Sequence, residues 1–212
     1  MNKIRASIKE FTHALLQINR TEAARILNRC YKSENDFCQL EQIIRESLDH
    51  IGTGWEKGIF SLAQVYMSGV ICEQLVDSYL PQAAVGPKTA PKIAIGVLED
   101  YHSLGKRIVS SVLRAAGYEL LDFGSGLSPE KIVTKTIEHQ VDLLLISTLM
   151  LPSALKVAEV KQKLQHAGEK IKIIVGGAPF RLDPQLGQRV GADAAGSTAF
   201  DAVSLIEKVY KT

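Results

Sequence analysis

A histidine and an aspartate two residues apart are the side chains of this protein best suited to metal chemistry. They lie in the segment 100–105, DYHSLG, just after the apolar run KIAIGVL at 92–98. A neutral imidazole is a good ligand for a transition metal, and a ligating histidine usually donates its other ring N–H to a carboxylate. Both side chains can point the same way from an extended loop. We therefore expect Asp100 to fix the tautomer of His102 and to make its ring more basic.

Two further groups of small and polar residues end apolar runs later in the chain: Ser147-Thr148-Leu149 and Gly176-Gly177. Strand-like runs at 92–98, 118–123, 142–147, 172–176 and 191–196 alternate with helical stretches at 105–116, 129–140, 153–167 and 200–210. This alternation predicts a parallel sheet with helices on both faces, in the flavodoxin-like, doubly wound order. Ligands of such sheets bind beyond the carboxyl ends of the strands, so we expect the three groups to meet there.

The first 80 residues show helical periodicity and no strand pattern. Apolar stripes at helical spacing run through Ile8, Phe11, Leu15 and Ile18, and through Leu40, Ile44, Leu48 and Ile51. Thr21 and Ser61 stand where helices are expected to start. The pattern predicts a bundle of four helices. The segment 81–91 contains three prolines and no apolar period, which indicates a linker. We therefore expect a helical cap domain over 1–86 and a Rossmann-like α/β domain over 87–212.

Composition and charge argue against several classes of protein. A formal net charge of +2 over 212 residues argues against nucleic-acid binding. No continuous apolar run is long enough to suggest a membrane span, and the N-terminus is typical of an amphipathic helix rather than a signal peptide. Cys30, Cys38 and Cys72 lie in helical patterns without metal-binding spacing. We expect them to be reduced thiols in a cytoplasmic protein.

The three groups of residues together resemble the cobalamin-binding domains of the methionine synthase and corrinoid methyltransferase family. That family carries D-x-H-x-x-G, then S-x-L, then G-G, at spacings close to those found here. Asp122-Phe123-Gly124, followed by Ser128-Pro129-Glu130, looks like the family's second strand and its turn. The stretch 55–64 looks like the helical cap of stand-alone corrinoid proteins, whereas the first 35 residues match only in helical character.

The resemblance implies a cobalamin site in which the cofactor's own base is displaced from the metal. His102 is then the lower ligand to cobalt, Asp100 is its relay partner, and Ser153, six residues after Ser147, completes the relay. The residues expected to bind the cofactor are Tyr101, His102, Ser103, Leu104, Gly105, Ser147, Leu149, Ser153, Gly176, Gly177 and Ala178. Two of them depart from the family pattern: Tyr101 replaces a smaller aliphatic residue, and Ser103 replaces a common acidic one.

Most of these residues also have a purely structural interpretation. His102 alone would be an ordinary exposed side chain, Asp100 alone a helix N-cap, and Gly176-Gly177 alone a strand-end turn. Ser153 alone would cap the helix at 153–167. Trp55 and Tyr66 fit either core packing or a cap over the corrin ring. The histidines without a partner motif are expected to be solvated or packed: His13, His50, His139 and His166.

The function that the resemblance implies is a corrinoid shuttle, a non-catalytic methyl-carrier subunit of a corrinoid-dependent methyltransferase system. A donor-specific methyltransferase would methylate Co(I). An acceptor methyltransferase would then pass the methyl group of methylcobalamin to tetrahydrofolate or coenzyme M, and a reductive activase would be a third partner. When His102 leaves the cobalt it would take up a proton, with Asp100 stabilising the imidazolium. A cobalamin-binding sensor and a mutase subunit are the alternatives. No basic patch supports the sensor, and the helical half counts against the mutase.

Overall fold

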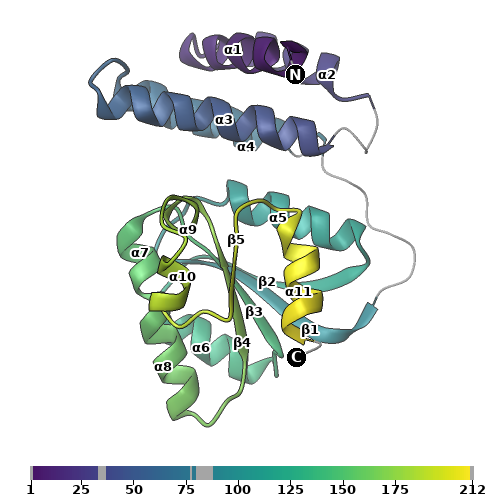
Figure 1. Ribbon diagram of the computed structural model, residues 1–212, viewed down its shortest axis with the longest axis vertical. Coiled ribbons are helices and arrows are strands. Elements are labelled where there is room, and N and C mark those ends of the chain that lie inside the picture. The colour runs from purple at the N-terminus through teal and green to yellow at the C-terminus, as the bar shows by residue number, and fades with distance from the viewer. Residues whose placement is uncertain (1, 33–36, 77, 80–87, 211–212) are drawn as a thin grey trace. The chain divides into compact units, whose positions relative to one another are not determined.

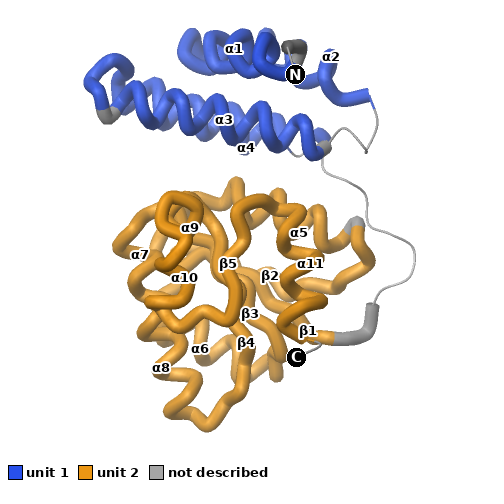
Figure 2. Tube along the Cα trace, in the orientation of Figure 1, with its two compact units in different colours: residues 1–81 blue, residues 82–212 orange. Residues whose placement is uncertain are grey.

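The computed structural model describes residues 2–32, 37–76, 78–79 and 88–210. The chain divides into two compact units, 1–81 and 82–212, coloured separately in Figure 2. The predicted boundary between residues 86 and 87 lies outside the described residues, as does most of the predicted linker at 81–91. Each unit has its own helices and its own surface. Among the residues described, no helix combines the length and the apolar character needed to span a bilayer.

The described part of the first unit folds into the four helices that the apolar periodicity predicts. They are α1 (Asn2–Leu16), α2 (Arg20–Cys30), α3 (Phe37–Glu56) and α4 (Leu62–Val76). Helix α1 packs against the other three, over a buried core that includes Phe11, Leu15, Ile26, Leu27, Leu40, Ile43, Ile44 and Ile51. Ile18 was expected on the first stripe, but it is exposed because it follows the end of α1 in a left-handed conformation, with φ 54°.

One of the two predicted helix starts in this unit is confirmed and the other is displaced. Ser61 Oγ accepts a hydrogen bond from the Gln64 N–H at 3.2 Å, and Gln64 Oε1 accepts one from the Ser61 N–H at 2.9 Å. This reciprocal capping box begins α4. Helix α2 starts before Thr21, because the Asn19 side chain accepts from the Glu22 N–H at 3.0 Å and takes the N-cap position.

The second unit contains a five-stranded, all-parallel sheet in the order β2-β1-β3-β4-β5, as predicted (Figure 1). Its strands are β1 (Lys88–Leu98), β2 (Tyr118–Leu127), β3 (Leu143–Ser147), β4 (Lys172–Gly176) and β5 (Ala194–Gly196). Residues 88–91 were assigned to the linker, but they belong to β1. The β1–β2 register shifts between Lys88 and Ile93, around Pro91, and a proline is tolerated in a strand at such an irregularity.

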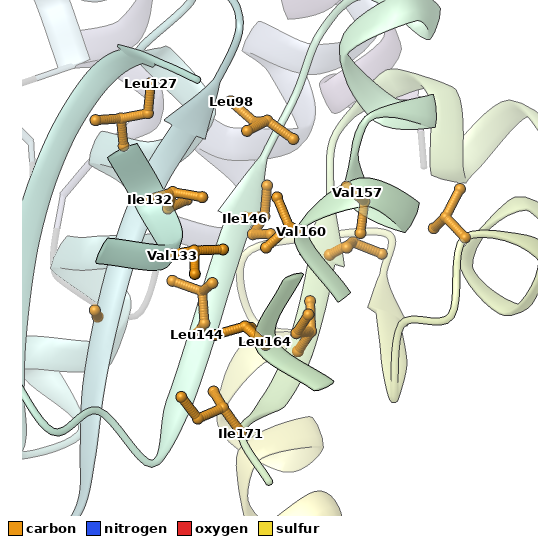
Figure 3. Close-up of a cluster of buried hydrophobic side chains, with 14 of the residues drawn as sticks. Leu98, Leu127, Ile132, Val133, Leu144, Ile146, Val157, Val160, Leu164 and Ile171 are labelled. Carbon is orange, nitrogen blue, oxygen red and sulfur yellow. The ribbon is translucent and has the colours of Figure 1, made fainter. Parts of the chain in front are cut away.

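Helices cover both faces of this sheet, because successive strand residues point to opposite sides. Ile93, Ile95, Leu143 and Leu145 pack against α5 (Leu104–Ala115) and α11 (Asp201–Tyr210). The intervening residues, such as Leu144 and Ile146, pack against the other helices: α6 (Pro129–Glu138), α7 (Leu151–Leu155), α8 (Val157–His166), α9 (Ala178–Leu182) and α10 (Leu186–Arg189). Figure 3 shows part of this second cluster, with Leu144 and Ile146 facing Val160 and Leu164.

Two helical details of this unit differ from the sequence prediction. The helix expected at 153–167 is two helices, α7 and α8, which meet at Lys156. The short helices α9 and α10 were not predicted, because five or fewer residues are too short to show an apolar period. Both differences lie on the face of the sheet that carries α6 to α10.

Candidate functional site

The carboxyl ends of three neighbouring strands bring the three groups of residues together. In the β1–β3 ladder Val97 lies opposite Ser147, and in the β3–β4 ladder Ser147 lies opposite Gly176. The segments 99–105, 147–149 and 176–178 therefore leave the sheet at one edge. Their convergence is a property of parallel pairing, since each strand here runs in the same direction and ends at the same level.

The Asp100 side chain joins the first of these segments to the second. Only 7% of Asp100 is exposed. Its Oδ1 accepts a hydrogen bond from the His102 N–H at 2.9 Å, and its Oδ2 accepts one from the Leu149 N–H at 3.0 Å. The interpretation of Asp100 as a helix N-cap is wrong, because Ser103 holds the N-cap position of α5. Asp100 instead ties the loop after β1 to the loop after β3.

The imidazole of His102 lies beside this buried carboxylate but is itself accessible. Its side chain is 56% exposed, and its Nδ1 lies 3.4 Å from Asp100 Oδ1. A buried carboxylate facing one ring nitrogen leaves the other nitrogen, Nε2, available to face a ligand. The pairing expected from the sequence is therefore present, and the exposed ring is available to a ligand outside the sheet.

The end of β2 supports the same loop from its other side. The Gly126 N–H donates to the Asp100 carbonyl at 2.7 Å, and the Glu99 N–H donates to the Leu127 carbonyl at 2.9 Å. Tyr101, 78% exposed, lies against Gly126, where an added Cβ would come within 2.6 Å of the tyrosine ring. Gly126 also has φ +67°, so only glycine fits there without strain. The departure of Tyr101 from the family pattern is thus matched by a glycine on β2.

Glycines also allow close approach between the remaining segments. A Cβ on Gly105 would lie 3.5 Å from Ser147 Oγ, in ordinary contact, so the first turn of α5 touches the end of β3. Gly177 has φ +120°, and a Cβ there would lie 1.8 Å from the Thr148 carbonyl oxygen. Gly176 is the last residue of β4 and Gly177 is the N-cap of α9. The two glycines therefore do form the turn at the end of a strand, as their structural interpretation predicts. The close approach of Gly177 to Thr148 is an additional constraint on the site.

The other predicted site residues take different positions around this edge. Ser103 and Leu104 begin α5, Ala178 begins α9, and Leu149 is 44% exposed. Ser153 is 5% exposed inside α7, where Met150 holds the N-cap position, so its interpretation as a helix cap is wrong.

The role of Ser153 in the relay stays a prediction. Among the described residues, the hydrogen bonds to the Asp100 carboxylate come from the His102 and Leu149 amides and not from the Ser153 hydroxyl. The buried position of Ser153 comes from α7, which follows directly after the loop at 147–149.

Lys106 is a residue of this region that the sequence reasoning missed. It lies in the first turn of α5, is 7% exposed, and its Nζ lies 2.5 Å from Asp122 Oδ1 on β2. A usable signal was present, because helical spacing places Lys106 on the same side of α5 as Ser110 and Leu113, both of which are buried. A lysine in that position needs an acidic partner, and Asp122 supplies one from a side chain that is 44% exposed.

Side chains away from this edge are also accounted for. His13, His50, His139 and His166 are all exposed, in agreement with a solvated role. Trp55 and Tyr66 are 47% and 69% exposed, so their interpretation as core residues is wrong, while a role in capping a corrin ring stays a prediction. The three cysteines are free thiols, of which Cys72 is buried and Cys38 exposed.

Comparison with known families gives this geometry its context. A family described as the B12 binding domain matches residues 92–204, which covers more than half of the chain. The chain belongs to the B12-binding family. A second B12 binding domain family matches residues 7–79, in the helical unit.

Relatives of this B12-binding chain extend over most of its length. A trimethylamine corrinoid protein of Methanosarcina acetivorans is 29% identical over 171 residues, covering 78% of each chain. A corrinoid protein of Desulfitobacterium hafniense is 26% identical over 214 residues, covering 97% of this chain and 98% of the relative. The solved structure of the Methanosarcina barkeri monomethylamine corrinoid protein superposes with a TM-score of 0.80 at 22% identity, covering 97% and 99%. That structural likeness supports the fold.

The residues at the carboxyl edge fit a B12 cofactor on their own chemistry. Cobalt in a macrocycle can accept a nitrogen ligand from a protein, and the exposed His102 imidazole offers one. A bulky polar ligand also needs hydrogen bonds from protein groups that are not already bonded to other protein groups. Thr148 is 2% exposed, and its hydroxyl has no hydrogen-bond partner among the described residues. An unsatisfied buried hydroxyl between Ser147 and Leu149 is a group that a ligand can satisfy.

Proposed function

We propose that this protein is a corrinoid carrier. It binds cobalamin with the nucleotide base displaced and His102 as the lower ligand, and it carries a methyl group between a donor-specific and an acceptor methyltransferase. The observation that carries the proposal is the buried Asp100 carboxylate, which faces the exposed His102 ring and holds the Leu149 amide. Relatives named as trimethylamine and dimethylamine corrinoid proteins support the carrier role.

Each residue of the carboxyl edge has a separate task in this proposal. His102 presents Nε2 to the metal, while Asp100 faces Nδ1 and holds the ring in one orientation. Two amide hydrogen bonds fix the Asp100 carboxylate itself, so the histidine is positioned before the ligand arrives. When bound, cobalamin supplies a cobalt centre that accepts a methyl group from one enzyme and releases it to another.

The other edge residues serve the nucleotide arm of the cofactor in this proposal. Gly105 lies beside Ser147, and Gly177 lies against Thr148, so the lack of a side chain lets the three segments that would hold the nucleotide arm approach one another closely. Leu149, half exposed, offers an apolar surface, and the Thr148 hydroxyl offers an unused hydrogen bond. Gly176, Ala178, Ser103, Leu104 and Tyr101 complete the contacts, and Ser153 supports the relay from α7.

Partners follow from the carrier role. A donor-specific methyltransferase, an acceptor methyltransferase that uses tetrahydrofolate or coenzyme M, and a reductive activase are proposed. A methanol:cobalamin methyltransferase complex from Methanosarcina barkeri has a similar fold, with a TM-score of 0.54 at 21% identity, over 98% of this chain and 81% of that one. In this proposal the methyl donor is selected by the partner enzyme.

Replacing the proposed ligand tests the site directly. His102→Gly removes the imidazole, while His166→Gly removes an exposed histidine from the end of α8 and is the matched control. Both variants are reconstituted with cobalamin and reduced to the Co(II) form. Electron paramagnetic resonance should show splitting by one imidazole nitrogen in the wild type and in His166→Gly, and not in His102→Gly. Unchanged splitting in His102→Gly contradicts the proposal.

A transfer assay separates a carrier from a sensor or a mutase subunit. The loaded, reduced protein is incubated with a methylamine methyltransferase and its isotopically labelled donor, and then with an acceptor methyltransferase. A carrier gains the label in the first step and loses it in the second. Retention of the label after the acceptor enzyme and its substrate are added contradicts the carrier role, because a sensor or mutase subunit has no reason to release it.

A further inference from the structure

Lys106 forms an ion pair with Asp122 next to the histidine loop. Lys106 follows His102 by four residues in the first turn of α5, and its side chain is 9% exposed. Its Nζ lies 2.5 Å from Asp122 Oδ1, on the neighbouring strand β2. A lysine buried to this extent requires a carboxylate partner, since an unpaired ammonium is costly away from water. The pair therefore fixes the start of α5 against β2.

Asp122 is itself held in place by its own strand. The same Oδ1 accepts a hydrogen bond from the Gly124 N–H at 2.8 Å. Burial by itself would raise the pKa of Asp122, but the hydrogen bonds from Lys106 and Gly124 outweigh it and hold the pKa below its ordinary value. The carboxylate is thus ionised at neutral pH and available to the ammonium. Both side chains of the pair are therefore charged. The Asp122 carboxylate is oriented by two hydrogen bonds, one from the Lys106 ammonium and one from the Gly124 N–H.

The contacts between β2 and the histidine loop lie on either side of His102. Before it, the Gly126 N–H binds the Asp100 carbonyl, and the Tyr101 ring lies on Gly126. After it, Lys106 binds Asp122. Both contacts come from the stretch 122–127 of β2. The loop that carries His102 is consequently bracketed by one short piece of a single strand.

The ladder between β1 and β2 gives only part of this support. Among the described strands, β2 pairs with β1 alone, at one end of the strand order. Its register to β1 shifts between Ile95 and Gly96, and again between Gly96 and Leu98. Two backbone hydrogen bonds still join the end of β2 to the loop, from the Glu99 N–H to Leu127 and from the Gly126 N–H to Asp100, but both lie before His102. After His102, the ion pair between Lys106 and Asp122 ties the start of α5 to β2.

We propose that Lys106 and Asp122 are a positioning pair, which holds the loop at 99–106 so that His102 reaches a metal at the carboxyl edge. The inference rests on the proposed function, because it assigns these two residues a task in His102 ligation. Neither side chain needs to touch the cofactor. The pair acts through the backbone on both sides of His102, and its loss widens the range of loop conformations.

Two variants remove the pair with different side effects. Lys106→Met keeps most of the buried stem but leaves Asp122 without its ammonium. The double variant Lys106→Met/Asp122→Asn removes both charges and keeps an amide oxygen for the Gly124 N–H, so it remains foldable if the single variant does not. The matched control is Lys161→Met, which breaks a partly buried ion pair with Asp193, at 2.9 Å, beside the amino ends of β4 and β5.

The readout is the fraction of bound Co(II) cobalamin that shows nitrogen splitting from the histidine. The ratio of ligated to unligated cofactor should fall about three- to tenfold in both pair variants, a typical effect of a part-buried charged hydrogen bond. Lys161→Met should leave this ratio within about twofold of the wild-type ratio. It should nevertheless lower the thermal stability about as much as the pair variants do, because it also breaks an ion pair. A merely structural pair lowers stability without changing the ratio.

The outcomes separate the two proposals. If wild-type protein shows the nitrogen splitting and the double variant shows the same ratio, the positioning role is overturned and the proposed cofactor site stands. If wild-type protein shows no nitrogen splitting, the proposed function fails, and this inference fails with it. If Lys161→Met lowers the ratio as much as the pair variants, the effect reflects general stability, and the positioning role is again overturned.

Discussion

Gly177 should be intolerant of any side chain, because two independent constraints meet at it. Its backbone has φ 120° and ψ 177°, a region that is essentially restricted to glycine, and a residue with a Cβ loses about 1–3 kcal/mol there. The added Cβ would also lie 1.8 Å from the Thr148 carbonyl oxygen. Backbone has to move by more than 1 Å to relieve that contact, which adds about 1–3 kcal/mol. We expect Gly177→Ala to cost about 2–6 kcal/mol of unfolding free energy, the sum of the two contributions.

Gly168→Ala is the matched control for the first of these constraints. Gly168 has φ +78°, and an added Cβ meets no atom within 4 Å. It therefore carries only the left-handed backbone cost, about 1–2 kcal/mol. Urea unfolding should be followed by far-ultraviolet circular dichroism. Tryptophan fluorescence is unsuitable, since the single tryptophan, Trp55, lies in the helical unit and not in the sheet.

The comparison between the two glycines tests the geometry of the carboxyl edge. Gly177→Ala should be less stable than Gly168→Ala by about 1–3 kcal/mol, the cost of the close contact, and it should also lose bound cobalamin on gel filtration. Equal destabilisation by the two substitutions would refute the close contact between Gly177 and Thr148. Full cofactor retention by Gly177→Ala would refute the argument that this approach shapes the binding edge.

Three further outcomes are expected from other parts of the protein. Thr148→Val should raise the stability of the cofactor-free protein by up to about 1 kcal/mol, because it removes an unsatisfied buried hydroxyl, and should weaken cobalamin retention; a loss of stability would contradict this. In the native protein a thiol reagent should modify the exposed Cys38 quickly. It should modify Cys72 only in denaturant, since burial raises the pKa of Cys72 to about 12; mass spectrometry of both peptides checks this. Burial alone would raise the pKa of Asp193, but the Ile173 N–H and the Lys161 ammonium outweigh it and lower the pKa. Asp193 therefore stabilises the fold above its ordinary pKa, and that contribution is lost as the pH falls through the lowered value, so Asp193→Asn should flatten the acid limb of a stability–pH curve.

The architecture was predictable because it depends on patterns that are short in sequence. Short apolar runs predicted the strands of the second unit, and apolar residues at a period of about 3.6 predicted the four helices of the first. Regular alternation of strands and helices predicted parallel pairing, and with it the edge at which 100–105, 147–149 and 176–177 meet. His102 is predicted as the cofactor ligand because three motifs at family spacing resemble the cobalamin-binding domains, whereas the histidine alone would be interpreted as an ordinary exposed side chain.

Local departures from pattern were not predictable in the same way. Residues 88–91 read as a linker because of Pro91, yet the strand accommodates it where the register shifts. Lys156 divides one expected helix into α7 and α8, and no proline or glycine in the sequence marks the division. Trp55 and Tyr66 have helical spacing with core residues, yet both are exposed. Spacing shows which side of a helix a residue lies on, but not whether another helix covers that side at that point along its length.

The order of the longer helices and strands, the strand topology and the residue types at the carboxyl edge can be read from the sequence, because they follow from periodicity and motif spacing. The short helices α9 and α10 and the division between α7 and α8 escape those patterns. The contacts between groups depend on the three-dimensional fold. Asp100 holds the Leu149 amide, Gly126 accommodates Tyr101, and Lys106 binds Asp122. Each of these contacts joins segments far apart in the chain. Their geometry depends on strand register and edge irregularities, which are set by the packing of the whole unit and not by any local stretch of sequence.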